Sequence, residues 1–222
     1  MEPILKAPMF AAGAIAAAGV GAFALKGLSL PGSEKSIPSL ISQDPSRRPI
    51  DMSEVENWKK VWQAYKDSGK DIWNIGNSGE EPAALKVACS EKLDSRVESR
   101  DSEGYKAFEK YCSRDTLVSD LIKENASGRA LIAKASGSSE EWKAAWKVYK
   151  EHVKNSNKAA NKDIWGLSDW PSKSSEENAP ESFMTKCESN SKTPFHNLEG
   201  DLYIYTVAFC TKDKAAVVNL GG

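Results

Sequence analysis

The sequence is poor in the residues and spacings that mark common catalytic and metal sites. It has only two histidines and four cysteines, and it contains no C-x-x-C pair, H-E-x-x-H motif, phosphate-binding loop or G-x-S-x-G motif. His152 lies in a charged run, and His196 lies in a polar loop. We therefore predict that the chain is not an enzyme and that it has no catalytic, cofactor-binding or metal-binding residues.

An excess of charge of one sign is also missing. Thirty basic and 31 acidic residues leave a formal net charge of −1. This balance excludes a general electrostatic attraction to nucleic acid, so no nucleic-acid partner is predicted. The hydrophobic share of 40% and the charged share of 27% are typical of globular proteins and exclude wholesale disorder.

The N-terminus holds a long stretch without charges. It covers residues 7–25 and lies between Lys6 and Lys26. A helix of this length can cross the apolar core of a bilayer. We predict a transmembrane or signal-anchor helix within residues 1–30, which would bind the membrane through residues 7–25, and a short linker over residues 31–36.

Two alternatives remain for this segment. Ala22-Phe23-Ala24 matches the A-x-A pattern of a cleaved signal peptide, and an alanine-rich helix can also be buried in a soluble core. Small residues recur at every fourth position, as in Ala14, Ala18 and Ala22. Such spacing lets two spanning helices approach closely, so a weak homo-oligomer is predicted.

The rest of the chain is a duplication. Trp58, Trp62 and Tyr65 each recur 84 residues later, and the tetrapeptide at 70–73 recurs word for word at 162–165. We therefore predict two tandem repeats, the first over residues 37–115 and the second over residues 116–222. Their predicted core comprises the recurring aromatic residues Trp58, Trp62, Tyr65, Trp73, Trp142, Trp146, Tyr149 and Trp165.

The spacing of these aromatic residues is helical, because they recur three and four positions apart. Ser53 with Glu56 and Ser138 with Glu141 have the spacing of a capping box, so we expect hydroxyl caps at the start of both helices. Rings of this size most often pack in a core. An aromatic platform for a ligand is the alternative.

Alignment of the two repeats decides the remaining elements. Residues 202–209 would be a strand by propensity, but their counterpart at 104–111 has the pattern of an amphipathic helix, so we predict helices in both. Each repeat opens with a short apolar segment, at 37–41 and 118–122, and the same 81-residue displacement places Arg48 on Arg129 and Ile50 on Leu131. The predicted fold class is all-α.

Each repeat contributes one pair of cysteines with a separation of 23 residues. Of the three possible pairings, only Cys89 with Cys112 and Cys187 with Cys210 is both local and symmetric, and it predicts two structural disulfides. Buried reduced thiols are the alternative. A zinc site is the third, although the two histidines do not correspond between the repeats.

These features resemble the large paralogous families of short proteins in haemotropic mycoplasmas. The resemblance rests on the alanine- and glycine-rich N-terminus, on the W-x-x-x-W-x-x-Y units, and on the cysteine segments that end at Tyr111-Cys112 and Phe209-Cys210. The second repeat departs from the pattern, because Thr206 stands where the first has Phe108. The resemblance implies membrane-associated surface proteins of a wall-less bacterium, and it carries over no active site.

We therefore predict a membrane-anchored surface protein that acts as an interaction or antigen module. Its localisation would be the cell membrane, as a single-pass protein with most of the chain outside, and its partners would be host or neighbouring surface proteins. One alternative is a secreted or membrane-tethered enzyme with a site between the repeats, built from Asp71 and Asp163. A second alternative is a scaffold that oligomerises through its membrane helix.

Overall fold

The computed structural model describes residues 34–80 and 82–214. The predicted membrane segment, residues 7–25, lies outside these ranges. Within them, no helix combines the length and the apolar character that crossing a bilayer requires. The prediction of a spanning helix therefore finds no support in the described part of the chain.

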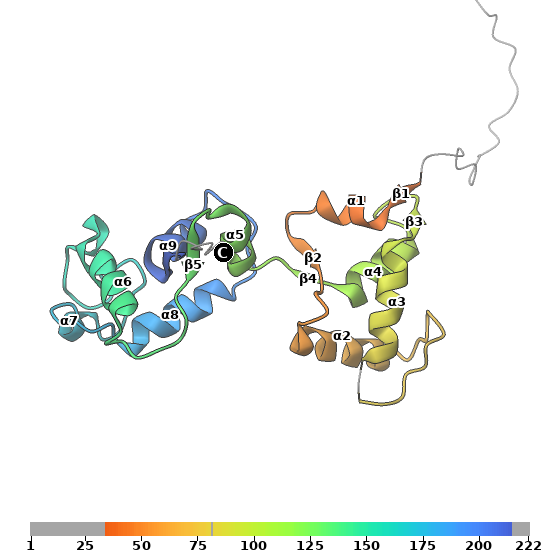
Figure 1. The fold of residues 1–222 in the computed structure, drawn as a ribbon, viewed down its shortest axis with the longest axis horizontal. Helices are drawn as coiled ribbons and strands as arrows, with labels where there is room; N and C mark the ends of the chain where they lie inside the picture. The colour runs from red at the N-terminus through yellow and green to blue at the C-terminus, as the bar shows by residue number, and fades with distance from the viewer. Residues whose placement is uncertain (1–33, 81, 215–222) are drawn as a thin grey trace, which may run out of the picture. The chain divides into compact units, whose positions relative to one another are not determined.

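Four helices and a few short strands form the first repeat (Figure 1). Two strands come early, one of them just before the repeat, and two follow the later helices. In chain order the elements are β1 (Lys35–Ser36), α1 (Ile37–Ser42), β2 (Arg47–Pro49), α2 (Val55–Asp67), α3 (Ala83–Leu93), β3 (Arg96–Val97), α4 (Glu103–Cys112) and β4 (Ser113–Asp115).

The second repeat follows the same order of elements, with additions after its tryptophan helix. These additions are the 3-10 turn η1 and the short helix α7. The elements are α5 (Val118–Asn125), β5 (Arg129–Leu131), α6 (Glu140–Glu151), η1 (Val153–Asn155), α7 (Trp170–Lys173), α8 (Glu181–Ser191), α9 (Asp201–Cys210) and β6 (Thr211–Asp213). The segment with high strand propensity is thus the helix α9, as its counterpart α4 predicts.

The all-α prediction is wrong, because three two-stranded antiparallel sheets accompany the helices. Strand β1 pairs with β3, β2 with β4, and β5 with β6. The bridge between Leu117 and Pro194 stands in the second repeat where the first has the β1–β3 pair. Strands of two or three residues are too short to show an alternating pattern, so periodicity could not reveal them.

One arginine in each repeat holds the main sheet against the end of the last helix. Arg47 donates to the carbonyl of Glu109 at 2.9 Å, to the hydroxyl of Ser113 and to the carboxylate of Asp115 at 2.6 Å. The terminal carbonyls of a helix lack backbone partners and attract cations. The guanidinium therefore ends α4 and aligns β2 with β4 at the same time.

Arg129 likewise joins the sheet to the end of the last helix in the second repeat. It donates to the hydroxyl and carbonyl of Thr211 and to the carboxylate of Asp213 at 2.6 Å. The structural counterpart of Arg129 is therefore Arg47, and the predicted match with Arg48 is wrong by one residue. The amide of Ile132 likewise donates to Cys210 as that of Ile50 does to Cys112, so the true displacement here is 82.

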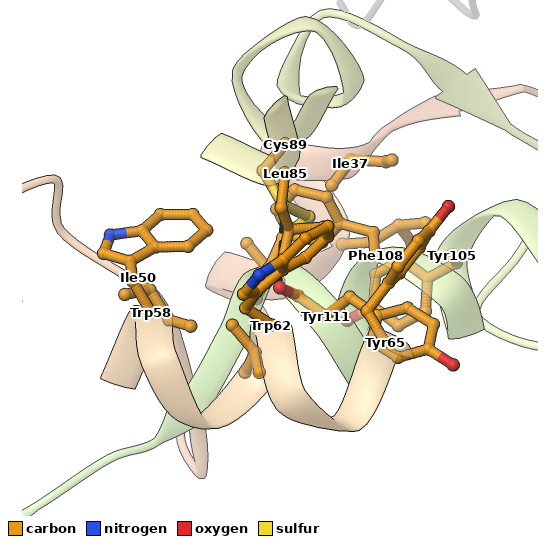
Figure 2. Packing of buried hydrophobic residues seen from close by; sticks show 14 residues of the cluster. Ile37, Ile50, Trp58, Trp62, Tyr65, Leu85, Cys89, Tyr105, Phe108 and Tyr111 are labelled. Carbon is orange, nitrogen blue, oxygen red and sulfur yellow. Dashed lines mark hydrogen bonds between the residues drawn. A yellow bond between two sulfur atoms is a disulfide. The ribbon is translucent and has the colours of Figure 1, made fainter. Parts of the chain in front are cut away.

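The hydrophobic core of the first repeat is a single cluster (Figure 2). Side chains of α1 through α4 meet in it, and Trp62, Tyr65 and Tyr111 lie close together at its centre. In the second repeat the apolar side chains of α5 form a second cluster with part of α9, beside the main cluster of α6, α8 and α9, and Leu131 packs against both. The two repeats thus share their helices but differ in the continuity of their cores.

One difference between the two cores is Thr206, which stands at the position of Phe108. The ring of Phe108 is buried and belongs to the same cluster as the apolar residues of α1. Thr206 is equally buried, but its short side chain donates its hydroxyl hydrogen bond to the carbonyl of Leu202, within α9 itself. The threonine therefore satisfies its own polar group but adds no ring to the core of the second repeat.

Each repeat contains one disulfide. Cys89 is bonded to Cys112 and Cys187 to Cys210, with Cα–Cα distances of 5.5 and 5.4 Å. This is the local and symmetric pairing that the equal spacing predicts. Each bond joins the last two long helices of its repeat, α3 to α4 and α8 to α9.

The helix caps differ between the repeats. Ser139 caps α6 by accepting a hydrogen bond from the amide of Trp142, so of the two serines that the sequence offers as caps, Ser138 with Glu141 and Ser139 with Glu140, the second is used. Ser53 does not cap α2, because its hydroxyl donates to Asp51 instead and Glu54 occupies the cap position. The carboxylate of Asp51 therefore outcompetes the expected capping box in the first repeat.

The side chain of Glu54 makes no capping hydrogen bond and instead forms a partly buried ion pair with Arg114. The guanidinium of Arg114 lies 2.6 Å from carboxylate oxygens of both Glu54 and Asp120, and its side chain is 16% exposed. Asp120 also accepts the amide of Leu117 and so caps α5. Burial alone would raise the pKa of both carboxyls, but the hydrogen bonds and the charge of Arg114, together with further hydrogen bonds from Asn57 to Glu54 and from the amide of Leu117 to Asp120, lower both pKa values.

We expect Arg114→Ala to lower the free energy of unfolding by about 1–3 kcal/mol at neutral pH, because two part-buried carboxylates lose their cation. The pKa values of Glu54 and Asp120 are both lower in the folded protein than their ordinary values of 4.5 and 3.8. The two ion pairs therefore stabilise the fold fully above these ordinary values, and this stabilisation is lost as the pH falls through the lowered, folded-state pKa values. Urea unfolding between pH 3 and pH 7 tests this. A difference between variant and wild type that stays constant over this range would contradict it.

Candidate functional site

The predicted repeat-core residues lie in the two cores. Six of them, Trp58, Trp62, Tyr65, Trp142, Trp146 and Tyr149, are buried, whereas Trp73 and Trp165 pack against the same clusters and are half-buried. The indole N–H groups of the four buried tryptophans in this set donate to backbone carbonyls. Trp62 donates to the carbonyl of Gly79 and Trp146 to that of Glu176, both at 3.2 Å. These rings therefore support the fold and do not form an exposed ligand platform.

The recurring aspartates hold the turn that follows each tryptophan helix. Tyr65 donates to the carboxylate of Asp71 at 2.8 Å, and the tyrosine oxygen accepts the amide of Trp73 at 3.1 Å. Asp71 also accepts the amides of Ile75 and Gly76. The carboxylate is thus fully engaged in ordering its own turn.

In the second repeat the same arrangement is buried. Tyr149 donates to Asp163 at 2.5 Å, and Asp163 accepts the amide of Leu167. Asp163 is 7% exposed, whereas Asp71 lies at the surface. Burial, and next the hydrogen bond to Asp163, raise the pKa of Tyr149, which therefore stays a neutral donor.

Asn155 and Trp170 add contacts to Tyr149 and to this turn. Asn155 is supplied by the eight additional residues between Tyr149 and Asp163. Its side chain donates to the carbonyl of Tyr149 and accepts the amide of Ile164, both at 2.7 Å. The ring of Trp170 is fully buried and packs edge-on against Tyr149.

The two aspartates do not form a common site. Asp71 orders a turn of the first core and Asp163 a turn of the second, and each accepts hydrogen bonds only from within its own repeat. These bonds count against the alternative of an acid-base site built from both carboxylates. Within residues 34–80 and 82–214, no three His, Cys, Asp or Glu side chains are grouped to hold a metal ion.

A different part of the second repeat forms the candidate site, an apolar pocket of about 210 Å³. Its walls come from α6, α8, α9, the end of β5 and the chain just after β5. The apolar lining includes the Cys187–Cys210 disulfide, and the lining residues are Leu131, Ile132, Lys134, Trp142, Glu181, Met184, Thr185, Cys187, Glu188, Ser191 and Cys210.

Helix α8 contributes one complete face to this pocket. Glu181, Met184, Thr185 and Glu188 follow the spacing i, i+3, i+4, i+7, which places them side by side along the helix. Met184 packs against the second core, and the two glutamates lie on the exposed part of the lining. The pocket therefore has an apolar interior with carboxylates at its margin.

The corresponding place in the first repeat is covered by a lysine. Lys86 stands 98 residues before Met184, as Cys89 does before Cys187. Its ammonium lies 5.7 Å from the centroid of the Trp58 ring and donates to the carbonyl of Met52 at 3.4 Å. The aliphatic chain of Lys86 thus crosses the tryptophan that corresponds to Trp142.

Comparison with protein-family models, with curated proteins and with solved structures finds no match to this chain. The resemblance to the families of haemotropic mycoplasmas therefore stays a prediction, and any function must be argued from the site itself. Of the lining residues, Trp142, Cys187 and Cys210 were predicted from the sequence as core and disulfide residues, whereas Glu181, Met184 and Thr185 were not. The 98-residue displacement already paired Lys86 with Met184, and this loss of a lysine beside a recurring tryptophan was the signal that could have found them.

Proposed function

We propose that this chain is a non-catalytic interaction module that anchors one side chain of a partner protein in the pocket of its second repeat. The observation that carries the proposal is the pocket beside Trp142, at a place where the first repeat covers the matching ring with Lys86. The two repeats have the same arrangement of helices, but beside the recurring tryptophan one has an open pocket and the other a covering lysine.

The size of the pocket supports a side chain as its occupant. Pockets for drug-sized molecules usually measure about 300–1,000 Å³. At about 210 Å³ this pocket is smaller and suits a single side chain. Burial of one apolar side chain contributes about 1.5–3 kcal/mol, and interfaces are dominated by a few such anchors in desolvated pockets.

The rigidity of the scaffold supports the same function. The pocket is lined by the disulfide that joins α8 to α9 and by Trp142, whose indole donates to the carbonyl of Ala133 at 3.1 Å. Side chains that the disulfide and the indole hydrogen bond already hold in place lose little conformational entropy when a partner binds. A preformed pocket therefore spends less of the interaction energy on ordering the site.

Substitution of a pocket residue tests the proposal. Thr185 is exposed and lines the pocket, so Thr185→Trp closes the pocket without disturbing the core. Val87 occupies the equivalent exposed position of the first repeat, and Val87→Trp adds the same ring away from the pocket. Peptides are selected from a random display library on the full chain, and their affinities for both variants are measured.

We expect the selected peptides to bind Thr185→Trp at least about tenfold more weakly and to bind Val87→Trp unchanged, because loss of one buried anchor costs more than about 1.4 kcal/mol. Equal binding to the wild type and to both variants would contradict the proposal, since the peptides would then use another surface.

We further propose that the module acts outside the reducing cytosol. Its two disulfides support this, because such bonds persist in oxidising compartments and are rare in the cytosol. All four sulfurs belong to buried residues, so the bonds form part of the core.

A membrane-impermeant maleimide applied to intact cells tests this location. We expect labelling of the unfolded chain's cysteines only after treatment with an impermeant reductant and mild denaturant. Labelling that requires permeabilised cells but no reductant would place the chain inside with free thiols and would overturn the proposal.

A further inference from the structure

The first repeat indicates what kind of side chain covers the recurring tryptophan. Lys86 lies across Trp58, with its ammonium 5.7 Å from the ring centroid. Lysine combines an aliphatic stem that packs on apolar surface with a cation that the face of an indole attracts. The chain itself thus supplies an alkylammonium at this position in the first repeat.

The second repeat exchanges this lysine for carboxylates. Met184 replaces Lys86, and the residues one turn before and after it are Glu181 and Glu188, where the first repeat has Ala83 and Ser90. At these three helix positions the first repeat therefore has a cation and no carboxylate, and the second has two carboxylates and no cation. The pocket lining also includes Lys134, whose ammonium lies 3.8 Å from Glu188. Both glutamates line the pocket.

The two glutamates differ in their partners. Glu188 forms ion pairs with Lys192 at 2.6 Å and with Lys134 at 3.8 Å. Glu181 accepts a hydrogen bond from the Thr185 hydroxyl at 3.4 Å, and among the described residues it forms no ion pair. The margin of the pocket at the start of α8 therefore carries a carboxylate whose charge no cation of the described chain balances.

We infer that the pocket takes the side chain of a lysine from a partner protein, with its aliphatic stem against Trp142 and Met184 and its ammonium at Glu181. This inference rests on the proposed function and names the chemistry of the anchor. The stem replaces water along the apolar wall, and the ammonium pairs with a carboxylate at a partly desolvated margin. An acidic or uncharged anchor would leave Glu181 unbalanced.

The probe for this inference is n-butylammonium, which has the length and charge of the lysine side chain. The matched control is 1-butanol, which has the same stem without the charge. Binding to the full chain is followed by the NMR signal of the Trp142 indole N–H, whose hydrogen bond to Ala133 holds it in place.

We expect n-butylammonium to bind about two- to fivefold more tightly than 1-butanol, which is the preference that one partly exposed ion pair provides. The preference should vanish in Glu181→Gln and fall at high salt. Met184→Lys should move the Trp142 signal in the direction of the bound state and abolish binding, because it recreates the covering lysine of the first repeat.

The other outcomes separate the inference from the proposed function. Equal or tighter binding of 1-butanol, with Glu181→Gln unchanged, overturns the lysine anchor and leaves an apolar anchor in the same pocket. If neither probe moves the Trp142 signal, and Thr185→Trp does not weaken the selected peptides, both the inference and the proposed function are overturned. Lys86→Met is the internal control, since it uncovers Trp58 where Ala83 and Ser90 stand in place of Glu181 and Glu188, and it should show no preference for the ammonium.

Discussion

Replacement of Cys187 and Cys210 by serine is expected to lower the free energy of unfolding by about 3 kcal/mol. The bond closes a loop with a separation of 23 residues, and the chain-entropy model assigns about this value to a loop of that length. The buried sulfurs also contribute apolar contacts within the core of the second repeat. The effect should appear as a lower urea midpoint.

The first repeat offers a matched control for this measurement. Cys89 and Cys112 have the same separation of 23, so the entropic contribution is the same and Cys89→Ser with Cys112→Ser should cost a similar amount. A double-serine variant of the second repeat with unchanged stability would contradict the prediction. A large difference between the two pairs would show that packing, and not loop closure, dominates.

Substitution of Asp163 by alanine is expected to cost about 3 kcal/mol, whereas Asp71→Ala should cost only about 1 kcal/mol. Both carboxylates accept a tyrosine hydroxyl and backbone amides of the following turn. A buried donor that loses its acceptor pays a desolvation cost of about 1–3 kcal/mol, but at the surface water replaces the acceptor. Asp163 is buried and Asp71 is exposed.

Denaturant unfolding of both variants, with Tyr149→Phe and Asp163→Asn beside them, resolves this prediction. Tyr149→Phe removes the hydroxyl that donates to Asp163. Asp163→Ala should therefore lower the free energy of unfolding less in the Tyr149→Phe background than in the wild type. Asp163→Asn keeps one acceptor oxygen and should recover part of the loss. Equal costs for Asp163→Ala and Asp71→Ala would show that burial does not set the strength of this contact.

Much of the helical framework could be predicted from the sequence because the chain contains its own alignment. The recurrence of Trp58 and Trp62 as Trp142 and Trp146 located both central helices, and the likeness of 104–111 to 202–209 correctly overrode the strand propensity of α9. Equal cysteine spacing gave the disulfide pairing. Local propensity alone would have failed at α9, where packing decides between helix and strand.

The sheets could not be found in this way. Strands β2 and β4 are three residues each, are rich in arginine and aspartate, and pair across more than sixty residues of chain, as Arg47 does with Asp115. Their register depends on the hydrogen bonds of Arg47 and Arg129 to the ends of α4 and α9. These contacts exist only once the helices have packed, so the one-residue error in the alignment was visible only in three dimensions.

The pocket likewise shows which features follow from the sequence and which follow only from the tertiary structure. By itself the sequence determined that two copies of one helical unit share an aromatic core and one disulfide each, because covalent order and side-chain periodicity carry that information locally. Only the tertiary structure decided that Trp142 meets Glu181 and Met184 around a pocket, while Lys86 covers Trp58. Which surface stays open depends on side chains that come together from distant elements, and the packing of those elements sets their distances.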